Sequence, residues 1–165
     1  EALRAEPEMK YMDTKTLNNW VASKKNLLNN SAYNAAAINR FIALRRKLVY
    51  ECNRSGVGLL LGSDAPQVFD VPGFSLHHEL KYLVDAGLTP YEALRTGTVN
   101  VGRFYNHPDW GVVKTGAAAD LVLLAGNPLS NIEATRNIEG VVLKGKWLPK
   151  SWIADQLKSL EKKPL

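Results

Sequence analysis

Asp64 occupies the position in this sequence that most favours chemistry. It follows the apolar run 58–61 and the pair Gly62-Ser63, and Pro66 comes two residues later. An apolar run without polar alternation is typical of a strand that is buried on both faces, as in parallel sheets covered by helices. In such folds ligands and catalytic groups lie at the carboxyl ends of the strands. The position therefore predicts a functional carboxylate, and the alternative is a turn residue that only ends the strand.

The other residue types that could bind a metal or act as nucleophiles are few. The chain has three histidines, His77, His78 and His107, and all of them come after Asp64. Its single cysteine, Cys52, excludes an internal disulfide and a cysteine-based zinc site. Because a zinc site needs three or more protein ligands, Asp64 cannot make one by itself.

The elements that would position Asp64 follow from hydrophobic spacing. Residues 31–54 predict an amphipathic helix that Ser31 can cap, and Gly56 then leads into the strand. A second helix is expected over about 76–86. Thr89-Pro90-Tyr91-Glu92 is a capping box with proline at the first helical position, and a further turn is expected over 98–104. Helix, short loop and buried strand together predict one αβ step of an α/β fold with a parallel sheet.

Beyond Trp110 the pattern changes to short strands. Segments 111–116, 119–124, 141–143 and 146–148 predict strands separated by glycine turns, and residues 151–162 predict an amphipathic helix. We therefore divide the chain into residues 1–110, 111–150 and 151–165.

Composition excludes several classes of protein. A chain of 165 residues with 45% hydrophobic and 22% charged residues is ordinary for a globular domain. The net charge of +5 is spread along the chain, which does not predict a nucleic-acid site. No apolar run approaches the roughly 18 to 20 residues of a membrane span, and the N-terminus has no signal-peptide core. We expect no membrane or nucleic-acid partner and a cytoplasmic protein.

The order of several motifs resembles the C-terminal third of the amidohydrolase superfamily, in its imidazolonepropionase-like and prolidase-like branch. The resemblance covers residues 55 to about 145 well and the first fifty poorly. It rests on residues 62–66 (Gly-Ser-Asp-Ala-Pro), 73–80 (Gly-Phe-Ser-Leu-His-His-Glu-Leu), 86–94, which include the capping box, 98–100 (Thr-Val-Asn), 111–124, with Gly-x-x-x-x-Gly-x-x-Ala-Asp-Leu-Val, and 127–129 (Asn-Pro-Leu).

The resemblance implies a fold and a chemistry. The fold is the last strand and flanking helices of a (β/α)8 barrel, plus part of a small composite β-sandwich domain. The reaction is metal-assisted hydrolysis of an amide, peptide-like or cyclic amide C–N bond in a small-molecule or dipeptide-like substrate. Asp64 matches the aspartate after the eighth strand, which contacts the divalent metal, zinc by expectation, and takes a proton from the attacking water.

The resemblance also suggests a substrate contact for His77, with a structural histidine at the start of a helix as the alternative. We expect His107 to lie in a surface turn. Asp120 is interpreted as a turn or cap residue, and Trp147 and Trp152 as packing residues.

The sequence lacks most of the family's metal ligands. The His-x-His motif, the bridging lysine or glutamate and two later histidines have no counterpart, and a (β/α)8 barrel takes about 250 residues. We therefore expect a fragment that is inactive alone and that assembles with the remainder of the enzyme or with another copy of itself, as an oligomer. The alternative is a truncated, non-catalytic homologue that acts as an assembly module.

Overall fold

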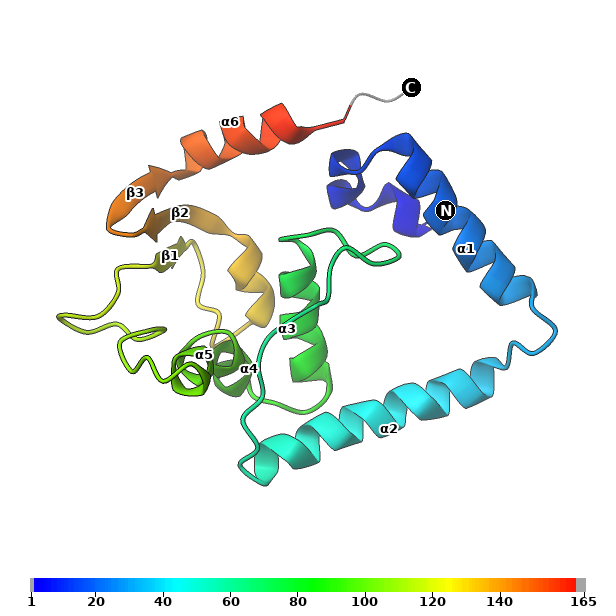
Figure 1. Cartoon of the computed structure of the whole chain (residues 1–165), viewed down its shortest axis with the longest axis horizontal. Coiled ribbons are helices and arrows are strands. Elements are labelled where there is room, and N and C mark those ends of the chain that lie inside the picture. The colour runs from blue at the N-terminus through cyan, green and yellow to red at the C-terminus, as the bar shows by residue number, and fades with distance from the viewer. Residues whose placement is uncertain (1, 163–165) are drawn as a thin grey trace.

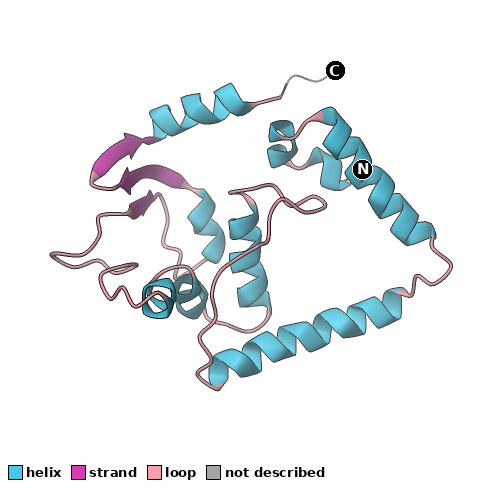
Figure 2. Ribbon diagram, viewed as in Figure 1, coloured by secondary structure: helices cyan, strands magenta, loops and turns pink. Residues whose placement is uncertain are grey.

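The computed structural model describes residues 2–162. It consists mainly of helices, with one small sheet near the C-terminal end (Figures 1 and 2). The elements are η1 (Ala2–Ala5), η2 (Pro7–Tyr11), α1 (Thr14–Asn29), α2 (Ala35–Arg54), α3 (Ser75–Asp85), α4 (Pro90–Thr96), α5 (Val99–Phe104), β1 (Leu121–Leu124), η3 (Ile132–Arg136), β2 (Ile138–Leu143), β3 (Lys146–Pro149) and α6 (Lys150–Leu160), where η marks a 3₁₀ helix.

Two long helices, α1 and α2, lie along the outside of the molecule (Figure 1). The N-cap of α1 is Asp13, whose carboxylate accepts a hydrogen bond from the Thr16 amide. The predicted helix over 31–54 is confirmed, but its cap is Asn34 rather than Ser31, because the Asn34 side chain accepts from the Ala37 amide. Helix α2 has no buried residue: Val49, near its C-terminal end, packs against the main core, whereas Phe41, Leu44 and Leu48 are exposed.

The predicted strand over residues 57–61 is wrong for this chain. The segment is irregular, and two of its backbone groups find single partners: the Leu61 amide donates to the Thr96 carbonyl at 3.0 Å, and the Leu59 carbonyl accepts from the Asn100 side chain at 3.0 Å. A strand needs a neighbouring strand to form its ladder. Among residues 2–162 the named strands all belong to the small sheet after residue 120.

The main hydrophobic core joins α3, α4 and η3. The predicted helices and the capping box are confirmed, since Thr89 Oγ1 accepts from the Glu92 amide while the Glu92 carboxylate accepts from the Thr89 amide. Core side chains that are buried together are Leu80, Leu83, Leu88, Ala93 and Ile132.

The sheet is antiparallel, with strand order β1-β2-β3. The strands predicted over 141–143 and 146–148 and the C-terminal helix are confirmed, and the strand predicted over 119–124 is present as its last four residues. The strand predicted over 111–116 is wrong: this segment forms bends and turns. Its two glycines have φ values of 67° and 83°, which are incompatible with extended strand geometry.

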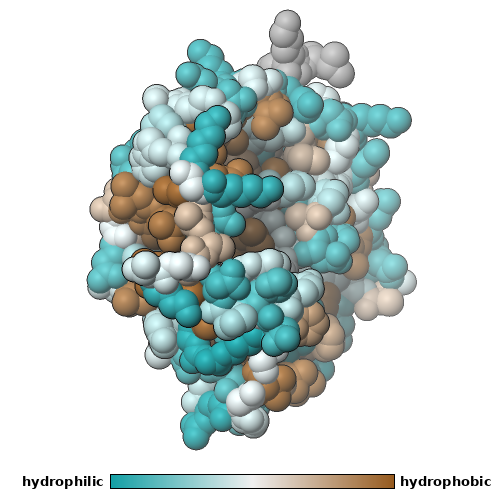
Figure 3. Space-filling model, turned by 60° about the vertical axis from the view of Figure 1, so that its left-hand side comes forward, coloured by the Kyte–Doolittle hydropathy of each residue, from teal (hydrophilic) through white to brown (hydrophobic). Residues whose placement is uncertain are grey.

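The surface carries apolar side chains in several exposed patches. On the face in Figure 3 they alternate with polar side chains around a hollow. None of the helices within residues 2–162 has the length and apolar character needed to cross a membrane.

Candidate functional site

Asp64 lies on the irregular loop that leads from α2 towards α3. Its side chain is exposed, and its Oδ2 accepts a hydrogen bond from Gln67 Nε2 at 3.3 Å. Its φ of 58° places it in the left-handed region, which aspartate tolerates better than most residues. A non-glycine residue in this conformation costs stability, and such residues are common at functional sites.

A pair of hydroxyl groups, one of them fully buried, fixes this loop to the start of α3. Ser63 Oγ and Ser75 Oγ are 2.7 Å apart, and Ser75 is only 1% exposed. Asp64 follows one of these serines, and His77 lies two residues after the other. The pair therefore brings the two predicted site residues into the same region, without a direct hydrogen bond between them in the described chain.

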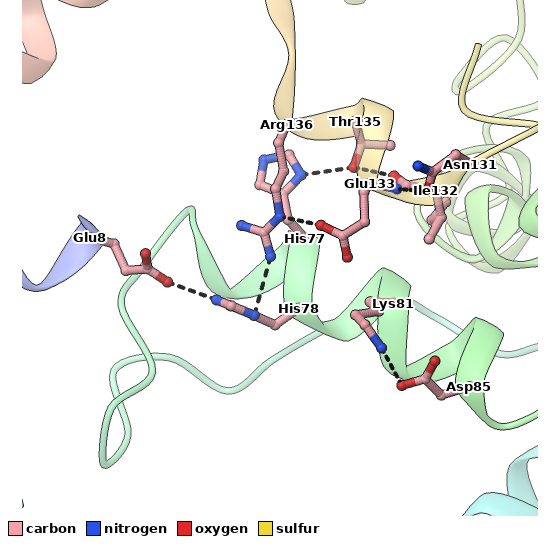
Figure 4. Close-up of polar contacts among 10 residues, drawn as sticks. All are labelled: Glu8, His77, His78, Lys81, Asp85, Asn131, Ile132, Glu133, Thr135 and Arg136. Carbon is pink, nitrogen blue, oxygen red and sulfur yellow. Dashed lines mark hydrogen bonds and ion pairs between the residues drawn. The ribbon is translucent and has the colours of Figure 1, made fainter. Parts of the chain in front are cut away.

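His77 is half-buried in the first turns of α3. Its Nδ1 lies 3.0 Å from Oγ1 of Thr135, a residue of η3 (Figure 4). Burial lowers the pKa of His77, and the positive charge of Arg136 lowers this pKa further. The ring therefore favours its neutral form.

His78, for which the sequence predicts no role, joins three distant segments. Its Nε2 lies 2.7 Å from the buried Glu8 carboxylate, and its Nδ1 lies 3.2 Å from the guanidinium of Arg136 (Figure 4). Arg136 in turn donates to Glu133 at 2.7 Å. Burial raises the pKa of Glu8, but the hydrogen bond from His78 and the nearby positive charge of Arg136 outweigh it and keep this pKa below its usual value. No local pattern signals a contact between residues 70 positions apart.

Two cavities, each of about 560 Å³, flank this region. Asp70 and Glu79 line the first cavity, and burial raises the pKa values of both carboxyl groups. The second is more apolar and is lined by His77 together with Leu61 and side chains of α4 and β1. Ser63, the neighbour of Asp64, lines the first cavity.

The described residues do not make a complete metal site. Within residues 2–162 no group of three or more histidine, cysteine, aspartate or glutamate side chains could hold a metal ion. Asp64 offers one carboxylate, which accepts a hydrogen bond from the side-chain amide of Gln67. The residues present therefore fit at most one ligand of such a site.

The remaining interpreted residues have structural contacts. Asp120 accepts a hydrogen bond from the Lys144 amide at 2.6 Å, as expected of a turn residue. The His107 ring is exposed and stacks on Trp110 at 4.1 Å, in a surface turn as predicted. The Trp147 ring covers Gly140 on the adjacent strand, which makes it a packing residue.

Comparison with known proteins identifies the family. A sequence model described as the amidohydrolase family matches residues 5–148, which is most of the chain. The chain belongs to the amidohydrolase family. Members of this family are in general metal-dependent hydrolases. A search of curated proteins finds no match for this member of the family.

Solved structures show the same fold. Bottromycin amidohydrolase matches with a TM-score of 0.73 at 23% identity, over 96% of this chain and 35% of that one. A Xaa-Pro dipeptidase with bound methionine in the active site matches with a TM-score of 0.60 at 20% identity, over 85% and 38%. Molinate hydrolase matches with a TM-score of 0.58 at 22% identity, over 91% and 32%. The chain thus spans about a third of the length of these relatives.

Proposed function

We propose that this chain is the C-terminal portion of an amidohydrolase that cleaves an amide, peptide-like or cyclic amide C–N bond, with Asp64 as its general base. The observation that carries the proposal is the placement of Asp64. It is an exposed carboxylate in a left-handed turn, next to a serine that a 2.7 Å hydrogen bond fixes to α3. A carboxylate held in this way can take a proton from an attacking water.

The proposal includes the last strand of a (β/α)8 barrel over residues 57–61, which would form once neighbouring strands are supplied. Family membership and the shared fold of longer relatives support this view. The remaining metal ligands would come from protein outside this chain, and zinc is the metal we expect. Alone, the chain would be inactive, because Asp64 would lack these partners.

The substrate class we favour is small and dipeptide-like. A Xaa-Pro dipeptidase is among the proteins of the same fold, and the more apolar cavity beside His77, about 560 Å³, is large enough for such a molecule. His77 is the residue we assign to substrate contact.

The test uses the longest protein that contains this chain. It would be assayed against dipeptides that end in proline and against N-acyl amino acids, before and after treatment with a chelator. We expect hydrolysis that the chelator abolishes and that zinc restores. Hydrolysis that persists in an Asp64→Asn variant would overturn the assignment of Asp64.

The alternative is a truncated homologue that acts as an assembly module. The exposed apolar face of α2 favours an association role of this kind. A protein whose mass in the source cell equals that of this chain, 18.3 kDa, would support the module. A longer protein with a His-x-His motif before this segment would support the enzyme.

A further inference from the structure

The hydrogen bonds around Thr135 determine which nitrogen of His77 carries the proton. Thr135 Oγ1 donates its single hydrogen to the Ile132 carbonyl at 2.8 Å, inside η3. A hydroxyl has one proton to give. At its 3.0 Å contact with His77 Nδ1, Thr135 must therefore accept, and Nδ1 must carry the hydrogen. Thr135 is 7% exposed, so water does not compete freely for this contact.

The second ring nitrogen of His77, Nε2, carries no hydrogen and is accessible to solvent. In a neutral imidazole with a hydrogen on Nδ1, Nε2 is a hydrogen-bond acceptor. Within residues 2–162 Nε2 of His77 has no hydrogen-bond partner. In the same range, Glu133 Oε1 is the single side-chain N or O atom that is both buried and without a partner, so Nε2 is not among the buried atoms. Nε2 must therefore be reached by solvent. Figure 4 shows it on the side of the ring that points away from Thr135.

The surroundings of His77 oppose protonation of this nitrogen. The side chain is half-buried. The charges of Arg136 and His78 lower the pKa of His77, and the carboxylate of Glu133 raises it. Burial is the largest of these effects, and it disfavours the imidazolium. The ring therefore stays neutral, with a lone pair on Nε2, near pH 7.

The neighbouring histidine has the opposite tautomer. Arg136 can only donate, so Nδ1 of His78 must accept, and Nε2 of a neutral His78 must carry the hydrogen that it gives to Glu8. Two consecutive residues of α3 thus differ in which nitrogen is protonated. His78 serves as an internal comparison for His77.

We propose that Thr135 is a positioning residue that holds His77 as a neutral acceptor, so that Nε2 receives a hydrogen bond from an N–H or O–H group of the substrate. The inference rests on the proposed function for the identity of the substrate site. The tautomer itself is independent of that function and can be measured without a substrate.

The first experiment is ¹⁵N NMR of the histidine side chains in the purified chain at pH 7.5. Only three histidines are present, so His78→Gln and His107→Gln variants assign all the signals. We expect His77 to show a protonated Nδ1 and a bare Nε2. Thr135→Val removes the acceptor and should move most of the His77 population to the Nε2–H form, whereas Thr135→Ser should restore the wild-type signals, and His107 should be unchanged.

A wild-type His77 with its proton on Nε2 would overturn the inference, and this result needs no variant to fold. A tautomer that Thr135→Val leaves unchanged would overturn the role of Thr135.

The second experiment tests the substrate contact in the longer enzyme. Thr135→Val should raise KM by about three- to tenfold with kcat nearly constant, which corresponds to one lost hydrogen bond, and Thr135→Ser should restore KM. An unchanged KM beside a confirmed tautomer would overturn the substrate contact while leaving Asp64 as the base.

Discussion

At the scale of single residues, Asp64 combines a demanding backbone conformation with an exposed carboxylate. Asparagine tolerates the left-handed region at least as well, and its amide oxygen can still accept from Gln67. Asp64→Asn therefore separates charge from conformation. In the longer enzyme we expect kcat to fall by roughly 10² or more while the melting temperature stays within a few degrees of wild type, because a general base is lost.

The matched control is Asp109→Asn, an exposed aspartate in the surface turn with His107. It removes the same charge and should leave kcat within about threefold of wild type. If Asp64→Asn behaved like this control, Asp64 would be a turn residue and not a catalytic one.

The isolated chain should bind zinc weakly. Its described residues contain no cluster able to hold a metal, and a zinc site needs three or more protein ligands. Calorimetry should therefore detect no binding beyond that of a surface carboxylate, and Asp64→Asn should change nothing measurable. A stoichiometric site with sub-micromolar affinity would contradict this expectation.

Residue-scale prediction from sequence succeeded where the signal was local. Asp120 at a turn and His107 in a surface turn follow from neighbouring residue types, and the structure agrees. The contacts of His78 with Glu8 and of His77 with Thr135 join residues 70 and 58 positions apart. Only the folded backbone brings these side chains together, so no spacing rule could have indicated them.

At the scale of elements, the loop before β1 depends on Gly111. Its φ is 67°, and a Cβ there would collide with the backbone of Thr98 at the start of α5. We expect Gly111→Ala to destabilise the chain by about 2 kcal/mol or more, since a left-handed conformation and a backbone clash act together. Urea unfolding followed by circular dichroism would measure this change.

Gly116 provides the control for this variant. Its φ is 83°, but no atom lies within 4 Å of the position its Cβ would take. Gly116→Ala should therefore lower the free energy of unfolding by only about 1 kcal/mol, which is the cost of the left-handed conformation without a clash. Equal effects at the two glycines would mean that the close approach of Gly111 to Thr98 has no energetic importance.

The capping box at the start of α4 makes a prediction that depends on pH. Hydrogen bonds from the Thr89 amide and hydroxyl, and from Asn53 of α2, hold the pKa of Glu92 below its ordinary value of 4.5. A carboxyl with a lowered folded-state pKa stabilises the fold above its unfolded pKa. This contribution should be lost as the pH falls below 4.5 and through the lowered value.

Two variants separate the cap from the charge. Thr89→Ala should cost about 1 kcal/mol at pH 7, as is usual for an N-cap. Glu92→Gln removes the ionisation, so its stability should depend less on pH between about 6 and 3 than that of wild type. Parallel pH curves for wild type and Glu92→Gln would show that Glu92 does not contribute through its charge.

Helices could be predicted from sequence because their signals are local, as the box from Thr89 to Glu92 illustrates. The strand over residues 57–61 could not be judged in the same way. An apolar run favours extended, buried backbone, but a strand also requires a neighbouring strand that pairs with its amides and carbonyls. In this chain Leu61 finds that partner in Thr96, so the segment remains irregular.

At the scale of the whole molecule, the chain exposes more surface than a compact monomer of its size. Its accessible surface is 11558 Å². A folded monomer of 18.3 kDa would expose roughly 8,100 Å² by the usual scaling with mass. The excess of about 3,400 Å² is several times the roughly 800 Å² that each partner buries in a standard interface.

Helix α2 contributes to this excess, because several of its large apolar side chains are exposed. Leu44 and Leu48 are 63% and 61% exposed, and no residue of this helix is buried. When another protein covers apolar surface of this extent, the burial stabilises the assembly by about 25 cal/mol per Å². We therefore predict that the chain is ordered only against other protein, which is the rest of the enzyme in the source cell and a second copy when the chain is purified alone.

Size-exclusion chromatography with light scattering tests this prediction. The purified chain should have a mass of at least twice 18.3 kDa. Leu44→Lys combined with Leu48→Lys should shift it towards a monomer with a less cooperative melt, because the charges oppose burial of α2. Leu129→Lys, at a loop residue that is 54% exposed, is the matched control and should leave the assembly intact. A stable, sharply melting monomer at micromolar concentration would instead mean that the chain closes its own core, and that the exposed face of α2 needs no partner.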